Sequence, residues 1–258
     1  RVLVFTEPLH WPEPKPPFVE QLPESWLKIP SVILSATATT KGSASAEAEI
    51  FAKDHLPAIG RVQGASGLLP VAGDLNPRPD AALLRQADVG VITPGKSAVA
   101  ATLGNSAVPS TELQTLVHAT RTPFSRVRVN TGPGAGLHLG DEIFVPLTHE
   151  VALLPGETAV PEINALDLIT ASVAGEDAEL LKTLGKEKVL VLGAGDAATR
   201  QRVQALAAAL SLPRLRVLSA QEQFIAWGVA GLLACSLLTL PKQKALVRSL
   251  FYLFLAIT

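Results

Sequence analysis

The stretch Lys188–Ser219, KVLVLGAGDAATRQRVQALAAALSLPRLRVLS, constrains the fold more than any other part of the chain. It opens with Val189–Leu192, an apolar run typical of a strand that is buried on both faces of a parallel sheet. Glycines interrupt this run, and Ala197–Leu210 is then rich in helix-forming residues. Pro213 ends the predicted helix, and Leu215–Leu218 is predicted as the next strand. This order predicts a βαβ unit, and therefore an α/β fold.

Elsewhere the hydrophobic pattern fits the same class, a parallel or mixed sheet flanked by helices. Strands are predicted at Arg1–Phe5, Ile29–Leu34 and Asp88–Thr93. Helices are predicted at Ala44–Leu56, Ala81–Ala87, Ser110–Thr120, Ile163–Ala174 and Glu176–Leu184. The glycine- and proline-rich residues 57–80 are predicted to form loops or short strands.

Four short runs between turns predict a small β-rich subdomain in the middle of the chain. They are Arg126–Asn130, Leu137–Leu139, Glu142–Leu147 and Glu150–Leu154. The chain therefore divides into an α/β region at 1–120, the β-rich subdomain at 121–160, an α/β continuation at 161–222 and an apolar anchor at 223–258.

The glycine turn of the βαβ unit resembles a nucleotide-binding motif by its spacing. Gly193-x-Gly195-x-x-Ala198 matches the dinucleotide fingerprint, in which glycines allow a tight turn and close approach of a pyrophosphate to a helix N-terminus. On this interpretation Gly193, Gly195, Ala198 and Ser219 would bind NAD(P) or ATP, with Ser219 near a 2′-phosphate. This is the alternative function, a nucleotide- or dinucleotide-binding enzyme.

Three features favour a purely structural βαβ turn instead. Asp196 places a carboxylate at the helix start, where it would repel a phosphate. Ser219 stands where a ribose-binding acid is expected, and Glu222 comes too late. The unit also comes late in the chain, which predicts that it forms the last layer of the sheet.

Two other patterns were weighed as sites. Gly90–Ser97, GVITPGKS, has the letters of a phosphate-binding loop, but its residues between the glycines are typical of a strand, so Lys96 is predicted to lie in a turn. His138, Asp141, Glu142, His149 and Glu150 gather in the β-rich stretch without a metal-ligand spacing. No catalytic residues and no metal site are therefore predicted.

The C-terminal part of the chain predicts a transmembrane or membrane-associated helix. Phe224–Leu240 contains no charged residue and lies at the lower edge of the length that spans a bilayer. Lys242, Lys244 and Arg248 follow it, which favours a cytoplasmic C-terminal side and an extracytoplasmic main domain. Packing of the same apolar segment on a partner subunit of a soluble complex remains the other possibility.

Charge and composition complete the functional expectation. A formal net charge of −1 gives no electrostatic basis for nucleic-acid binding, and the single cysteine excludes a disulfide within the chain. The expected partners are membrane lipid and other protein subunits. The sequence thus predicts a membrane-anchored α/β protein with a non-enzymatic binding, scaffold or assembly role in a membrane complex, with no cofactor assigned.

Overall fold

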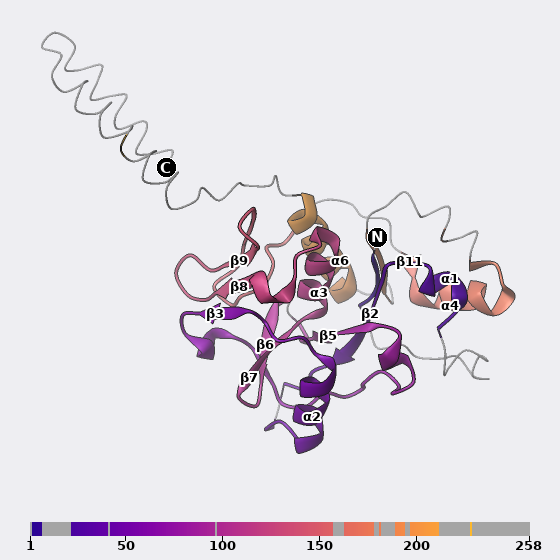
Figure 1. Ribbon diagram of the computed structural model, residues 1–258, viewed down its shortest axis with the longest axis horizontal. Coiled ribbons are helices and arrows are strands. Elements are labelled where there is room, and N and C mark those ends of the chain that lie inside the picture. The colour runs from indigo at the N-terminus through magenta and orange to yellow at the C-terminus, as the bar shows by residue number, and fades with distance from the viewer. Residues whose placement is uncertain are drawn as a thin grey trace, which may run out of the picture. The chain divides into compact units, whose positions relative to one another are not determined.

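The computed structural model describes residues 2–6, 22–40, 42–95, 97–156, 163–177, 181, 189–193, 197–211 and 228. All of these except Gly228 belong to one compact unit, Arg1–Leu215, and the second unit is Arg216–Thr258. The described part is an α/β structure with one parallel sheet and two mixed sheets (Figure 1). The predicted α/β class is confirmed.

The main sheet has five strands, all parallel, in the order β11-β12-β1-β2-β5. Its members are β1 (Val2–Phe5), β2 (Ser31–Thr37), β5 (Asp88–Ile92), β11 (Ile163–Asn164) and β12 (Val189–Gly193). The prediction that the βαβ unit forms the last layer is wrong, because β12 lies inside this sheet and pairs with β1. Position along the chain did not determine position in the sheet, since β12 and β1 pair across almost the whole unit.

Helices cover both faces of this sheet. On β1, Leu3 and Phe5 join one apolar cluster with Trp26, which lies in α1 (Glu24–Leu27). The same cluster contains residues of α4 (Ala165–Ala174). The alternate residues Val2 and Val4 belong to a separate cluster, against which a residue of α3 (Thr111–Thr120) packs. Burial on both faces explains why these strands are continuous apolar runs.

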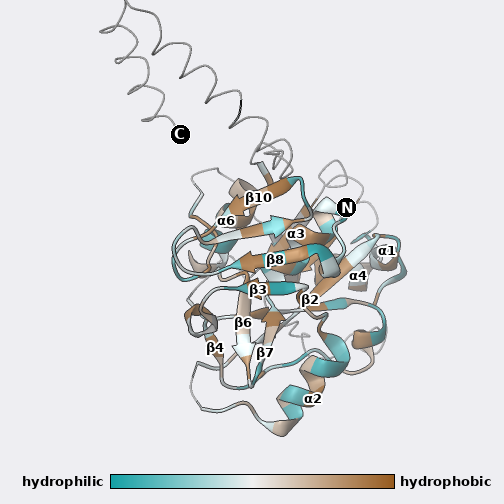
Figure 2. Cartoon of the chain, turned by 60° about the vertical axis from the view of Figure 1, so that its left-hand side comes forward, coloured by the Kyte–Doolittle hydropathy of each residue, from teal (hydrophilic) through white to brown (hydrophobic). Residues whose placement is uncertain are grey.

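Two smaller sheets complete the part of the fold that the structure describes. The four-stranded sheet has the order β10-β9-β8-β3, and the three-stranded sheet has the order β4-β6-β7. Their strands are β3 (Arg61–Gln63), β4 (Val71–Ala72), β6 (Ala100–Leu103), β7 (Ser106–Pro109), β8 (Val127–Asn130), β9 (Gly136–Leu139) and β10 (Ile143–Pro146). In Figure 2 the two sheets lie one above the other, with α2 (Ala46–His55) below them. Three 3₁₀ turns also occur, at Ser66–Leu68, Leu83–Arg85 and Phe124–Arg126.

Most predicted elements are present, with informative differences. The strand predicted at Ile29–Leu34 begins two residues later and ends three residues later, as Ser31–Thr37, and the helix predicted at Ala81–Ala87 is reduced to a 3₁₀ turn. Glu150–Leu154 makes only isolated bridges rather than a strand. The helix predicted at Glu176–Leu184 and the strand at Leu215–Leu218 lie largely or wholly outside the described residues.

Helix α3 lies between two sheets and is the most enclosed helix of the described unit. One side of it contacts β1, β2 and β5. Its residues Leu113, Leu116 and Val117 pack into a cluster with the inner side chains of β8, β9 and β10. The consecutive residues Thr111–Val117 are all buried as a result. Residues of α6 (Ala197–Ser211) complete the same cluster.

The described residues include no helix that is both long and apolar enough to cross a bilayer. The predicted anchor, Phe224–Leu240, lies outside the described residues except for Gly228.

Gly90, in the middle of β5, tests how closely α3 packs on the parallel sheet. A Cβ at this position would overlap the backbone of Thr111, with the Thr111 nitrogen only 2.6 Å away. Backbone cannot move aside as a flexible side chain can, so Gly90→Ala should lower the free energy of unfolding by about 2–3 kcal/mol. Urea denaturation measures the loss.

Gly67→Ala is the matched control, because a Cβ there meets nothing within 4 Å. An equal and small effect of the two substitutions would contradict the close packing of α3 on β5.

Candidate functional site

The order of the strands reverses between β1 and β12. The chain leaves β1 for β2 on one side, whereas β12 and β11 occupy the other side. At such a reversal the connections leave a parallel sheet in opposite directions, and a crevice opens outside the carboxyl ends of the strands. We call this place, after Phe5 of β1 and Gly193 of β12, the carboxyl edge.

Gly193 is required by close packing at the carboxyl edge. A Cβ on this buried glycine would overlap the methyl group of Thr199 in α6 and would lie 2.8 Å from Thr6 Oγ1. Thr6 itself donates a hydrogen bond from Oγ1 to the Leu192 carbonyl, 2.9 Å away. The first glycine of the fingerprint therefore allows α6 to approach the ends of β12 and β1.

The four residues predicted to bind a cofactor divide into two groups. Gly193 ends β12, and Ala198 is exposed in the first turn of α6. Gly195 and Ser219 lie outside the described residues, as does Asp196. The structure thus brings Gly193 and the start of α6 to the carboxyl edge.

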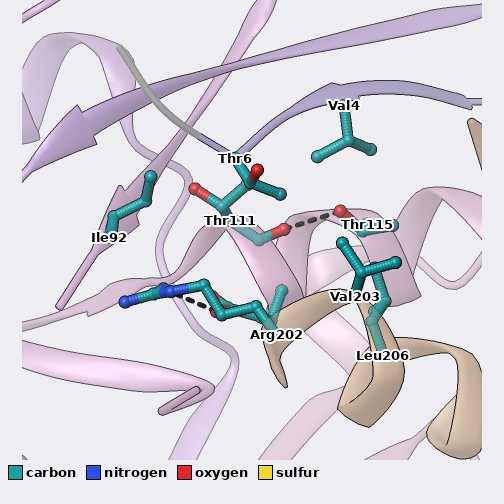
Figure 3. A pocket seen from close by; sticks show the side chains of 9 residues that line it. Val4, Thr6, Ile92, Thr111, Thr115, Arg202, Val203 and Leu206 are labelled. Carbon is teal, nitrogen blue, oxygen red and sulfur yellow. Dashed lines mark hydrogen bonds and ion pairs between the residues drawn. The ribbon is translucent and has the colours of Figure 1, made fainter. Parts of the chain in front are cut away.

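A small cavity lies beneath this edge, between the sheet, α3 and α6 (Figure 3). Its volume is about 10 Å³, which is close to the room that one water molecule needs. Three threonines, Thr6, Thr111 and Thr115, are among the lining residues. Thr115 Oγ1 donates to the Thr111 carbonyl at 2.7 Å, and the Thr111 hydroxyl lies 2.9 Å from that of Ser35.

A buried ion pair closes one side of the cavity. Arg202 of α6 donates through one guanidinium nitrogen to Glu112 Oε1 at 2.8 Å, and through the other to the Thr93 carbonyl. The exposed fractions of the Arg202 and Glu112 side chains are 8% and 5%. Burial raises the pKa of the Glu112 carboxyl, although the arginine opposes the rise.

Two oxygen atoms beside this pair lack a hydrogen-bond partner among the described residues. They are Glu112 Oε2 and Thr93 Oγ1. Buried polar atoms are normally satisfied, so the pair holds unused hydrogen-bonding capacity next to the cavity.

The buried pair had no signal in the sequence. Glu112 fits an acidic residue in the first turn of a helix, where solvent exposure is normal. Its partner Arg202 is 90 residues further along the chain.

The phosphate-loop pattern at Gly90–Ser97 does not form a phosphate loop in the described residues. Gly90 lies within β5 under α3, and the next regular element after the pattern is strand β6 rather than a helix. A phosphate loop needs a helix N-terminus at that place. Lys96 itself is outside the described residues.

The histidine cluster does not form a metal site in the described residues, where no group of three or more candidate ligands is close together. His138 Nε2 instead lies 3.2 Å from the Asn130 amide nitrogen, and its ring packs against that of Phe144 at an interplanar angle of 52°, with the centroids 4.9 Å apart. Burial, followed by the nearby positive charge of Arg128, lowers the pKa of His138.

A second polar cluster was also missed by the sequence analysis. Ser31, Asp88 and His118 come from β2, β5 and α3, and the fold brings their side chains within hydrogen-bond distance. We call this group the amino-edge triad, because Ser31 and Asp88 begin their strands. The wide spacing of the three residues explains why no local motif revealed them.

Comparison with known protein families, with curated proteins and with solved structures finds no match for this chain.

Replacing Arg202 with methionine tests the buried pair. Arg202→Met should lower the free energy of unfolding by about 3–5 kcal/mol at neutral pH, because it leaves the Glu112 carboxylate buried without its counter-charge. The double variant Glu112→Gln/Arg202→Met should recover much of this loss. Arg128→Met is the control, since its pair with Asp141 is exposed and is expected to contribute at most about 1 kcal/mol.

The pH dependence of that loss has a definite sign. Because burial raises the pKa of Glu112, the folded protein holds this proton more tightly than the unfolded chain does. Protonation of Glu112 therefore contributes to the free energy of unfolding at pH values below the ordinary glutamate pKa. This contribution is lost as the pH rises through the raised pKa of Glu112 in the folded protein. The loss of unfolding free energy caused by Arg202→Met should therefore become smaller as the pH falls towards the pKa of an ordinary glutamate. A cost that grows on acidification would contradict this.

Proposed function

We propose that this chain is a membrane-anchored α/β protein of a membrane complex, and that its carboxyl edge is a ligand site with a non-enzymatic binding, scaffold or assembly role. The observation that carries the site is the position of Gly193, which ends a central strand at the place where the strand order reverses. Small phosphorylated ligands bind at this place in open parallel sheets, beside the N-terminus of the next helix.

The hydrogen bonds at the edge support a binding role. The hydroxyl of Thr6 is used to hold β12, that of Ser35 donates to the Phe5 carbonyl, and that of Thr115 is used within α3. Side chains committed to backbone carbonyls give the edge a fixed shape. They are poorly suited to exchange protons with a substrate during a reaction.

The membrane part of the proposal depends on the sequence of Phe224–Leu240. The segment is uncharged and contains small residues that permit close helix packing, so it suits both lipid and neighbouring subunits. The cationic residues that follow it favour an extracytoplasmic main domain.

The second candidate is a nucleotide-dependent enzyme that uses the turn Gly193–Ala198. The packing of Thr199 against Gly193 favours it, because close helix approach is one of the roles of glycine in the dinucleotide fingerprint. Both candidates place the ligand at the same edge, and a nucleotide titration tests the shared step.

NADPH and ATP should each be titrated while the melting temperature is followed. A ligand at about ten times its dissociation constant stabilises a protein by about 1.4 kcal/mol, which corresponds to a rise of about 3–5 °C for a domain of this size. No shift with either ligand at millimolar concentration would leave only the anchored assembly role.

Asp196→Asn sharpens the titration. Asparagine still caps a helix but carries no charge, so a phosphate near the start of α6 should bind several-fold more tightly to this variant. Asp167→Asn, an exposed acid in the first turn of α4, is the matched control and should leave the affinity unchanged. An equal gain in both variants would indicate a general charge effect rather than binding at the carboxyl edge.

Flotation of the full chain with phospholipid vesicles tests the anchor. Leu232→Arg places a charge in the centre of Phe224–Leu240, where it costs about 2.5–3.5 kcal/mol on insertion scales, and should reduce the floating fraction. Ile50→Arg is the control: this α2 side chain is 60% exposed, so the substitution should leave the floating fraction unchanged. A full chain that stays at the bottom of the gradient would remove the anchor.

A further inference from the structure

We propose that the amino-edge triad is a serine-nucleophile acyl-transfer site, in which Ser31 attacks esters of small acids. The inference is independent of the proposed function, because the triad lies at the opposite ends of the strands from the carboxyl edge. Its basis is the juxtaposition of a hydroxyl, an imidazole and a carboxylate that come from three separate elements.

The sheet register places the serine and the carboxylate on one face. Ile33 of β2 pairs with Asp88 of β5, and Ser31 lies two residues before Ile33. Because side chains alternate along a strand, Ser31 and Ile33 point to the same side, and Asp88 lies beside them. His118, in the last turn of α3, covers this side of the sheet.

The His118 ring lies between the carboxylate and the hydroxyl. His118 Nε2 lies 3.2 Å from Asp88 Oδ2, and His118 Nδ1 lies 2.9 Å from Ser31 Oγ. We place the ring proton on Nε2, the nitrogen that faces the Asp88 carboxylate. Nδ1 therefore presents its lone pair to the Ser31 hydroxyl, which donates. This is the arrangement that a general base and its nucleophile require.

The surroundings favour the charges that form during acyl transfer. His118 lies at the C-terminal end of α3, where the helix dipole favours a cation, and Asp88 stabilises the same imidazolium. The exposed fractions of the His118 and Asp88 side chains are 25% and 50%, so a substrate can reach the site from solvent. An open site of this kind offers little surface for a long acyl chain, which points to short acyl groups.

The reaction balances without any reagent besides water. Ser31 Oγ forms a bond to the acyl carbon while its proton passes to His118 Nδ1, and the alcohol leaves with that proton. Water then attacks the acyl-serine and gives a proton to His118. The acid departs as this proton returns to Ser31 Oγ. Asp88 takes no proton in these steps and acts as a positioning residue for the ring.

The test uses the full chain and p-nitrophenyl acetate. The wild-type protein should release p-nitrophenolate in an initial burst equal to the protein concentration, and mass spectrometry should find the acetyl group on Ser31. A fluorophosphonate probe should label the same residue, which provides a measurement on the unaltered protein. Acetyl or probe found only on other side chains, or no acylation at all, overturns the proposal.

Substitutions then assign the roles. Ser31→Ala should abolish the burst, and His118→Gln should slow acylation about 100-fold or more, the scale of general-base catalysis. Asp88→Asn should lower kcat about tenfold or more with KM unchanged, and Asp88→Glu should recover part of the rate. A burst that persists in Ser31→Ala overturns the assignment of the nucleophile. If Asp88→Asn lowers kcat, KM and the melting temperature at the same time, the assignment of Asp88 is overturned.

Two controls separate the triad from ordinary surface chemistry. Free imidazole groups also react with activated esters, so His55→Gln removes an exposed histidine of α2 outside the triad. Ser106→Ala removes an exposed serine of β7. Both variants should keep the full burst, and loss of the burst in either one contradicts the proposed nucleophile and base.

Discussion

The enclosure of α3 between two sheets is the constraint on which the rest of the described structure depends. Residues Thr111–Val117 of this helix are all buried, so their polar groups depend on partners within the protein, because water cannot reach them. The Ser110 hydroxyl accepts from the Leu113 N–H, and the Gln114 amide nitrogen donates to the Val89 carbonyl. Glu112 Oε2 and Gln114 Oε1 have no hydrogen-bond partner among the described residues. Glu112 obtains its counter-charge from α6. The polar residues of this helix therefore fix how β5, α3 and α6 fit together.

The sequence was informative wherever structure is determined locally. The apolar run before the glycines, the serine that begins the predicted helix Ser110–Thr120, and the turns between β8, β9 and β10 all depend on neighbouring residues, and the corresponding elements were predicted correctly. The parallel pairing of β3 with β8 could not be predicted, because it joins segments that are remote in the chain and carries no periodic signal. The short strands β6 and β7 were missed for the related reason that their small residues have weak strand preference outside a sheet.

The two candidate sites differ in how far the sequence could indicate them. At the carboxyl edge, Gly193 belongs to a recognisable spacing, yet its reason, contact with Thr199 and Thr6, depends on the strand order. The amino-edge triad has no spacing at all, since its members are positioned by register between β2 and β5 and by the length of α3. The same parallel strands thus bring residues together at both ends, and the strand order and register of the folded sheet determine which residues meet.

The pairing of β1 with β12 also has a consequence for how the chain is made. The Thr6 hydroxyl and the Leu192 carbonyl that it contacts are separated by 186 residues. At synthesis rates of about 5–20 residues per second, β1 waits roughly 10–40 s for that neighbour to be translated. During this interval β2 can cover one side of β1, while the other side presents unpaired backbone groups and apolar side chains. The nascent chain is therefore expected to depend on a chaperone, or on slow collapse of its own small sheets, to protect that side until β12 is made.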